Sequence, residues 1–174
     1  MGIVKTPPDV CLIAAICYNA EFDIEPVMEI LESLYGAIEF KSDVFDFVHT
    51  NYYKQEMGES LRKFFCSFKN LIEPMQIVDI KLKTNEIEEQ NKKSGNRMVN
   101  LDPGYMEPAK LILATTKNFS HRIYLGKGIY GDVQLFWRDN RFQDNPWTYP
   151  DYKEERTKEF FTRVRKNYLQ KGVI

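Results

Sequence analysis

The pattern of apolar and polar positions predicts a regular succession of strands and helices in the first half of the chain. Residues 10–18 (VCLIAAICY) form a continuous apolar run, which is typical of a central strand covered on both faces. An amphipathic helix follows, with Asp23 as its cap and Gly36 at its end. Its apolar stripe consists of Ile24, Val27, Leu31 and Leu34.

Two more strands and a second helix are predicted next. Residues 38–47 and 61–68 are β-compatible apolar runs separated by a polar segment. Pro74 suits the first turn of a helix, and Gly95 is expected to end it. Residues 97–101 then form a fourth strand. The resulting β-α-β-β-α-β order is that of a ferredoxin-like split βαβ unit.

The last third of the chain predicts a hairpin and a terminal helix. Residues 109–116 fit a buried strand and a short helix equally well, because their periodicity does not separate the two. Residues 121–125 and 129–138 are predicted to pair as a hairpin. The last helix is expected to begin near Asp151, where Glu154 would complete a capping box. Its apolar stripe, which would dock it on the core, consists of Phe160, Phe161, Val164 and Tyr168.

The expected fold class is therefore α+β, with a ferredoxin-like βαββαβ core extended by a C-terminal β-hairpin and a terminal helix. With 174 residues, of which 43% are hydrophobic and 14% aromatic, the chain can bury one good core, so we expect a single domain over residues 1–174. Its 24 basic and 25 acidic residues nearly cancel, which disfavours a general nucleic-acid-binding protein. A local basic patch would still permit such a partner.

The sequence indicates neither a membrane segment nor disulfide bonds. The first residues lack a charged segment followed by an apolar one, and no run reaches the ~20 apolar residues of a membrane span. We expect a cytoplasmic protein without membrane contact. Cys11 and Cys17 would lie roughly 20 Å apart in one strand, too far for a bridge. With Cys66 they show no metal-ligand spacing, so we interpret all three as reduced core residues and expect no metal site.

The densest group of polar residues lies between Asn100 and Asp132. It combines Asp-Pro-Gly, Thr-Thr-Lys, one of the two histidines, an adjacent arginine and a three-glycine loop. Such residues suit a packed core poorly, so their clustering between apolar runs suggests a ligand-binding or catalytic surface on a β framework. The candidate catalytic residues are Asp102 and His121. The candidate ligand-binding residues are Asn100, Tyr105, Thr115, Thr116, Lys117, Arg122 and Lys127.

Several of these residues also have a structural interpretation. Asp102 can hold an Asp-Pro-Gly turn with its own side chain, and His121 can be a hydrogen-bonded core residue. In the expected hairpin register Arg122 lies opposite Asp132, where an exposed ion pair would contribute about 0.5 kcal/mol. The same register points His121 and Arg122 to opposite faces, so they are not expected to share a pocket.

Two further motifs favour structure over function. The loop that begins at Gly126 (GKGIYG) satisfies GxGxxG, but a strand follows it, which excludes a dinucleotide-binding fingerprint. Its glycines either allow a tight turn or contact a phosphate. On the second predicted helix, Lys81, Asn85 and Glu88 form a polar stripe, which is usually a solvated face.

Five segments that together cover most of the chain carry a resemblance to a known family. They are YYKQEMG (52–58), IKLKTNEIE (80–88), VNLDPGY (99–105), KLILATTKNFSHRIYLGKGIYGDV (110–133) and PWTYPDY (146–152), in that order. Through them the sequence resembles the domain-of-unknown-function family 4416, uncharacterised proteins of bacteria and archaea. Gly131 is a departure, since similar proteins tend to carry alanine there. Some members are labelled GTP-binding proteins, yet this sequence has no guanine-nucleotide motif. The resemblance implies an intracellular single domain and no particular reaction.

The leading hypothesis is binding of a small anionic ligand, a nucleotide or a phosphorylated metabolite, at the 100–132 surface. Lys117, Arg122 and Lys127 would neutralise the anion, while Thr115 and Thr116 would donate hydrogen bonds. Convergence of these groups on one concave pocket would favour this hypothesis. The sequence predicts neither a cofactor nor an oligomeric state, and it does not decide whether the protein is an enzyme.

The alternative is a non-enzymatic module that binds protein, or RNA by base stacking, through exposed aromatic side chains. The residues proposed for that surface are Tyr52, Tyr53, Trp147, Tyr149 and Tyr152.

Overall fold

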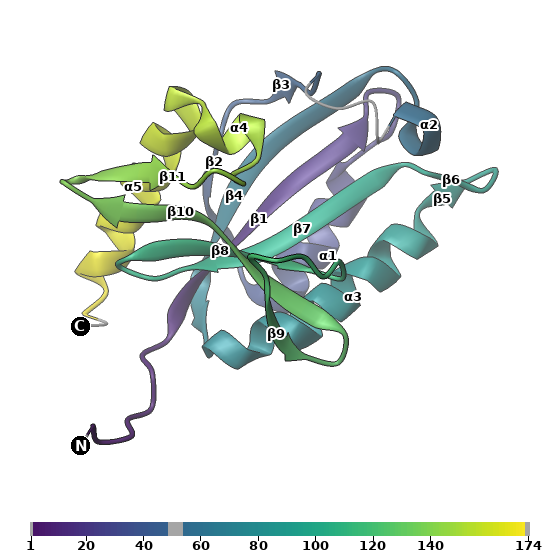
Figure 1. The fold of residues 1–174 in the computed structure, drawn as a ribbon. Coiled ribbons are helices and arrows are strands. Elements are labelled where there is room, and N and C mark those ends of the chain that lie inside the picture. Colours follow the sequence, from purple (N-terminus) through teal and green to yellow (C-terminus); the bar gives the residue numbers. More distant parts are fainter. Residues whose placement is uncertain (1, 49–53, 173–174) are drawn as a thin grey trace.

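A central strand with both faces covered organises the molecule. The computed structural model describes residues 2–48 and 54–172 (Figure 1). Strand β1 (Val10–Asn19) pairs with β4 (Leu61–Ile72) on one side and with β7 (Val99–Met106) on the other. Its side chains are buried on both faces, as the continuous apolar run predicts.

Further antiparallel strands extend this centre in both directions. On the β4 side lie β2 (Ile38–Lys41) and β3 (Phe45–Asp46), so the single strand predicted at 38–47 is in fact two short strands, both paired with β4. The other strands are β8 (Lys110–Thr115), β9 (Ile123–Gly126), β10 (Ile129–Arg138) and β11 (Arg141–Asp144). Over the described residues the sheet has nine strands in the main order β11-β10-β8-β7-β1-β4-β2, with β3 beside β4 and β9 beside β10.

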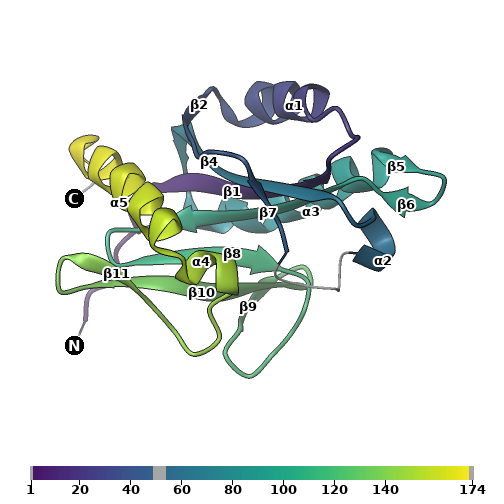
Figure 2. The same ribbon diagram turned by 90° about the horizontal axis from the view of Figure 1, so that it is seen from above.

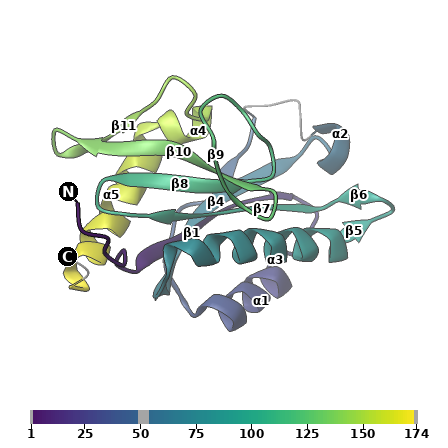
Figure 3. The same cartoon turned by 60° about the horizontal axis from the view of Figure 1, so that its bottom comes forward.

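Two helices cover one face of this sheet. They are α1 (Glu25–Tyr35) and α3 (Ile77–Gln90), the latter preceded by a 3-10 turn at Pro74–Gln76. Figure 3 shows both helices on the same side of the strands. Their buried side chains form one core with alternate residues of β1, among them Leu12 and Ile16.

The opposite face carries the C-terminal helices. These are α4 (Pro150–Lys153) and α5 (Glu155–Gln170), which lie beside β10 and β11 in Figure 2. Phe160 and Phe161 of α5 pack against Phe65 of β4, with ring centroids 6.3 and 5.3 Å away. The predicted α5 stripe, which also includes Val164 and Tyr168, is buried and therefore confirmed.

The α+β class is confirmed, while several details of the predicted elements are wrong. Leu34 is 47% exposed and lies outside the buried stripe of α1. Helix α3 ends at Gln90, and Gly95 instead lies in the turn of a small hairpin formed by β5 (Lys92–Lys93) and β6 (Asn96–Arg97). The ferredoxin-like comparison remains a prediction, because the sheet continues well beyond β7, β1, β4 and β2.

The start of the terminal helix also differs from the prediction. The backbone is extended at Glu154, which separates α4 from α5. Asp151 lies inside α4 and makes no capping hydrogen bond there. Its carboxylate instead forms a buried ion pair with Lys63 of β4 at 2.6 Å. The capping-box pattern was therefore a chance match.

The Asp-Pro-Gly sequence is not a turn, because β7 continues through it to Met106. Gly104 is required by close approach to β8: a Cβ atom added there would lie 2.3 Å from the carbonyl oxygen of Ile112. Pro103 has no N–H group, and β8 pairs with β7 only from Gly104 onwards. Proline is tolerated in a strand at such an unpaired position. Tertiary pairing thus overrides the local turn propensity.

Candidate functional site

The sheet opens between β7 and β8. These strands pair only where Gly104–Met106 meets Leu111–Leu113. Residues 99–102 of β7 pair with β1 on their other side. In an antiparallel strand the N–H and C=O of one residue point the same way, so Leu101 directs both groups into this opening.

Helix α3 supplies the partners that a neighbouring strand would otherwise provide. The N–H of Leu101 donates to Oε1 of Glu88 at 2.7 Å. The carbonyl oxygen of Leu101 accepts a hydrogen bond of 2.8 Å from Nζ of Lys81. Both α3 side chains are buried, so the predicted solvated stripe is wrong. A strand edge with satisfied backbone groups can remain open beside a cavity.

This opening forms a cleft of about 510 Å³. Its walls come from α3, the start of β7, the end of β8 and the loop that follows β8, and Asp132 of β10 and Tyr149 also line it. The predicted site residues that line the cleft are Asn100, Asp102, Thr115, Thr116 and Lys117.

The charged groups in the deeper part of the cleft are arranged as ion pairs. Nζ of Lys81 lies 3.2 Å from Oδ1 of Asp102, and Nη1 of Arg97 lies 2.9 Å from Oε2 of Glu88. Asn100 connects the two pairs, because it accepts a hydrogen bond from Arg97 and donates one of 2.8 Å to Asp102. The network fixes the orientation of these side chains.

For both carboxyl groups, Glu88 and Asp102, burial acts to raise the pKa and pairing with cations acts to lower it. Burial raises the pKa of Glu88 above its ordinary value, although Lys81 and Arg97 oppose that shift. Burial also acts to raise the pKa of Asp102, but the positive charges of Lys81 and Lys63 outweigh it, so the pKa lies below its ordinary value. Asp102 is therefore an ionised hydrogen-bond acceptor at neutral pH.

Asp132 is the most deeply buried acid of the cleft wall, with 1% of its surface exposed. Its Oδ2 accepts a 2.8 Å hydrogen bond from Nε of Arg122 and lies 3.5 Å from Nε2 of His121. Among the described residues, Oδ1 has no hydrogen-bond partner. Most buried polar atoms in folded proteins do have a partner.

Arg122 and Asp132 are in contact, as predicted, but they lie in a buried and not an exposed environment. The pair is buried, so the small energy assigned to an exposed pair does not apply. His121 and Arg122 also approach the same carboxylate, contrary to prediction. The reason is that β9 begins only at Ile123, so strand alternation does not govern the two preceding residues.

Tyr149 completes the polar wall beside Asp132. Its hydroxyl oxygen accepts a 3.0 Å hydrogen bond from Nη2 of Arg122. Burial, together with the nearby charges of Asp102, Asp132 and Asp151, raises the pKa of Tyr149 to about 12 despite Arg122. The hydroxyl is thus protonated at neutral pH and can donate a hydrogen bond.

Four predicted site residues do not line the cleft. Tyr105 is buried in the core beneath α1 and α3, and Lys127 pairs with Asp79 near the tip of the β9–β10 hairpin. Positive φ angles at Lys127 and Gly128 (49° and 80°) bear out the tight-turn interpretation of the glycine loop. Arg122 and His121 do not line the cleft themselves, but Arg122 contacts three residues that do, Asp132, Tyr149 and Lys117. The His121 ring stacks on Trp147 at 4.7 Å.

The proposed aromatic surface is only partly present. Tyr152 is fully buried, so its assignment to an exposed surface is wrong. Trp147 and Tyr149 are 39% and 36% exposed, and Tyr149 belongs to the cleft wall. Tyr52 and Tyr53 lie outside the described residues.

Several cleft residues were given other roles by the sequence, or no role at all. The α3 stripe is visible in the sequence, but nothing in the helical pattern shows that an open strand edge faces it. The sequence suggests Asp132 only as a partner of Arg122. The cleft residues that were not assigned to the site include Lys81, Glu88, Arg97, Asp132 and Tyr149.

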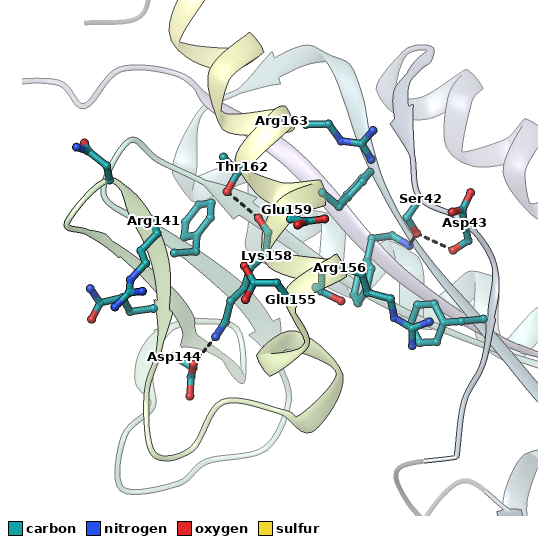
Figure 4. A pocket seen from close by; sticks show the side chains of 17 residues that line it. Ser42, Asp43, Arg141, Asp144, Glu155, Arg156, Lys158, Glu159, Thr162 and Arg163 are labelled. Carbon is teal, nitrogen blue, oxygen red and sulfur yellow. Dashed lines mark hydrogen bonds and ion pairs between the residues drawn. The ribbon is translucent and has the colours of Figure 1, made fainter.

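A larger hollow of about 1000 Å³ lies between α5, β11 and the Ser42–Asp43 segment (Figure 4). Lys158 spans it to reach Asp144 at 2.6 Å, and Arg156 covers the ring of Phe45. None of the buried side-chain atoms that lack a partner among the described residues belongs to its lining. The polar cleft is therefore the better candidate for a specific site.

Other features of the described residues add little chemistry. Cys11, Cys17 and Cys66 are buried free thiols, and burial raises the pKa of each to about 12. No three histidine, cysteine or acidic side chains within residues 2–48 and 54–172 are grouped as metal ligands. None of the helices in these ranges combines the length and hydrophobicity that a bilayer-crossing segment requires.

The sequence profile of the family described as Domain of unknown function (DUF4416) matches residues 8–168. The chain belongs to this family. The match runs from the residues before β1 to Tyr168 in α5, so DUF4416 includes every wall of the cleft. Comparison with curated proteins and with solved structures found no match in either case.

Proposed function

We propose that this DUF4416 protein binds a small anionic ligand, a nucleotide or a phosphorylated metabolite, in the cleft between α3, β7 and β8. The observation that supports the proposal is the shared location of Asn100, Asp102 and 115–117 in the wall of one cavity. Its volume of about 510 Å³ lies within the range of small-molecule sites, about 300–1,000 Å³.

The anionic part of the ligand would lie at the mouth of the cleft. The deeper cations are already paired with carboxylates. Thr116 and Lys117 are exposed directly after β8, where a hydroxyl and an ammonium group can donate to phosphate oxygens. Nη1 of Arg122 donates to the carbonyl oxygen of Lys117 at 3.0 Å and orders this segment.

The alternative of an aromatic interaction surface has less support. Burial of Tyr152 removes one of its members, and Tyr149 forms part of the cleft wall. Reduced exposed aromatic area weakens the argument for a protein or RNA surface.

The test is a thermal-shift screen with nucleoside phosphates and phosphorylated metabolites, followed by calorimetry. A ligand at about 100 times its Kd should add about 2.7 kcal/mol to the free energy of unfolding. Thr116→Val and Lys117→Ala should weaken binding about tenfold each and leave the unliganded melting temperature almost unchanged.

Lys127→Ala is the matched control, because Lys127 is an exposed lysine outside the cleft. It should bind the same compound as tightly as the wild type. The proposal fails if no compound binds, or if Lys127→Ala weakens binding as much as Lys117→Ala does.

A further inference from the structure

We infer that the inner part of the cleft binds an uncharged group of the ligand that carries a hydrogen-bond donor next to an acceptor, and that Oδ1 of Asp132 receives the donor. This inference rests on the proposed function and specifies the chemistry of a group of the ligand other than its anion.

Among the described residues, only one oxygen of the Asp132 carboxylate has a hydrogen-bond partner. Arg122 occupies Oδ2, whereas Oδ1 has no partner within the described residues. The side chain is 1% exposed and lines the cleft. A buried acceptor without a partner is unfavourable, and a ligand N–H or O–H group would satisfy it.

The charge balance of the cleft disfavours a cationic group on the ligand. Each carboxylate of the inner wall already has a cation: Arg122 for Asp132, Lys81 for Asp102 and Arg97 for Glu88. An ammonium group on Asp132 would lie close to the guanidinium of Arg122, and like charges repel strongly where water is excluded. An uncharged N–H or O–H donor avoids that repulsion.

Tyr149 supplies a hydrogen-bond donor beside Asp132. Arg122 donates through Nε to Asp132 and through Nη2 to the hydroxyl oxygen of Tyr149, so one guanidinium positions both groups. The oxygen of Tyr149 is thus an acceptor for Arg122, and its O–H has no acceptor among the described side chains. Tyr149 can therefore donate to the ligand while Asp132 accepts from it.

Two kinds of ligand present such a neighbouring donor and acceptor. A nucleobase does so with its ring and exocyclic groups, and a sugar does so with its hydroxyls. The probes should therefore be the four common nucleoside 5′-monophosphates and a hexose phosphate, with inorganic phosphate as the anion alone.

Isothermal calorimetry on the full chain with these probes tests the inference. Asp132→Asn should weaken the tightest probe about 30-fold, because an amide N–H would face the donor of the ligand. Tyr149→Phe should weaken it about fivefold to tenfold, through loss of one hydrogen bond. Inorganic phosphate should bind all variants alike.

Asp151→Asn is the matched control, because Asp151 is an equally buried aspartate with a cationic partner but does not line the cleft. Its affinity for the probe should stay within about twofold of the wild type even though its stability falls. Circular dichroism checks that each variant is folded. If Asp132→Asn does not fold, Tyr149→Phe decides, and unchanged affinity in that variant overturns the inference.

The outcomes separate this inference from the proposed function. Binding that Thr116→Val weakens and Asp132→Asn leaves unchanged overturns the role of Asp132 and keeps the proposed function. No binding of any probe overturns both. Preference for a nucleotide assigns the inner group as a base, and preference for the hexose phosphate assigns it as hydroxyls; either result, with the expected loss in Asp132→Asn, supports the inference.

Discussion

The ammonium group of Lys81 on α3 lies 3.2 Å from Oδ1 of Asp102 on β7, and it also donates a 2.8 Å hydrogen bond to the carbonyl oxygen of Leu101. One side chain therefore satisfies a strand backbone group and balances a carboxylate of the cleft. Because both partners belong to β7, the position of α3 and the shape of the cleft depend on the same contact.

Replacement of Lys81 with methionine should destabilise the fold by about 2–4 kcal/mol, because it leaves the Leu101 carbonyl and a partly buried carboxylate without their partner. Urea denaturation monitored by circular dichroism measures this change. Lys83→Met is the control on the same helix, since Lys83 forms an exposed pair with Glu86. That variant should change stability by less than about 0.5 kcal/mol. Equal effects in the two variants would contradict the structural role of Lys81.

Asp102→Asn should lower stability at neutral pH by about 1–2 kcal/mol, because the amide loses the charge attraction of Lys81. The pKa of Asp102 in the folded protein lies below its ordinary value of 3.8, so ionisation of this group stabilises the fold above that pH. The contribution disappears as the pH falls through the lower, folded-state pKa. The stability difference between wild type and variant should therefore be constant above pH about 5 and should shrink in more acid solution. A difference that grows on acidification would have the wrong sign.

Gly104→Ala should destabilise the protein by about 2–3 kcal/mol, because the added methyl group would lie 2.3 Å from the backbone oxygen of Ile112. Thermal and urea unfolding both report this loss. Gly131→Ala is a matched strand control, whose added carbon would be 3.4 Å from the side chains of Ile112 and Leu125. It should stay within about 1 kcal/mol of the wild type, since alanine also restricts the unfolded chain. A larger cost at Gly131 than at Gly104 would contradict the described β7–β8 contact.

The three cysteines should resist thiol reagents in the native protein. Burial raises the pKa of Cys11, Cys17 and Cys66 to about 12, so almost no thiolate forms at pH about 8, and the thiols are also inaccessible. Absorbance of released thionitrobenzoate should rise only after addition of urea. Rapid reaction of one equivalent in native buffer would show that one of these core positions opens.

The sequence predicted those elements whose buried faces follow directly from the local pattern of apolar residues. A continuous apolar run identified β1 as a central strand, and the stripe of α5 identified its buried face. The Asp-Pro-Gly segment was misjudged because turn propensity is local. The position of β8 relative to Pro103 and Gly104 is a long-range property that these residues do not encode by themselves.

The candidate site was predicted in part for the same reason. Clustering of polar residues placed Asn100, Asp102 and the 115–117 segment together, and they do line one cleft. The stripe on α3 looked like a solvated face because a helical pattern does not show what packs against it. Glu88 and Lys81 bond to the backbone of Leu101 because β8 does not pair with β7 at that position.

The backbone hydrogen bonds of Leu101 also bear on how the protein avoids aggregation. An unpaired strand edge is a template for β-pairing with another chain, and natural proteins protect such edges with charged side chains or a covering helix. Here Glu88 and Lys81 occupy the N–H and C=O that an incoming strand would need. Helix α3 thus protects the edge of β7 from pairing with another chain. The sheet can therefore contain an open cavity without offering a site for strand addition.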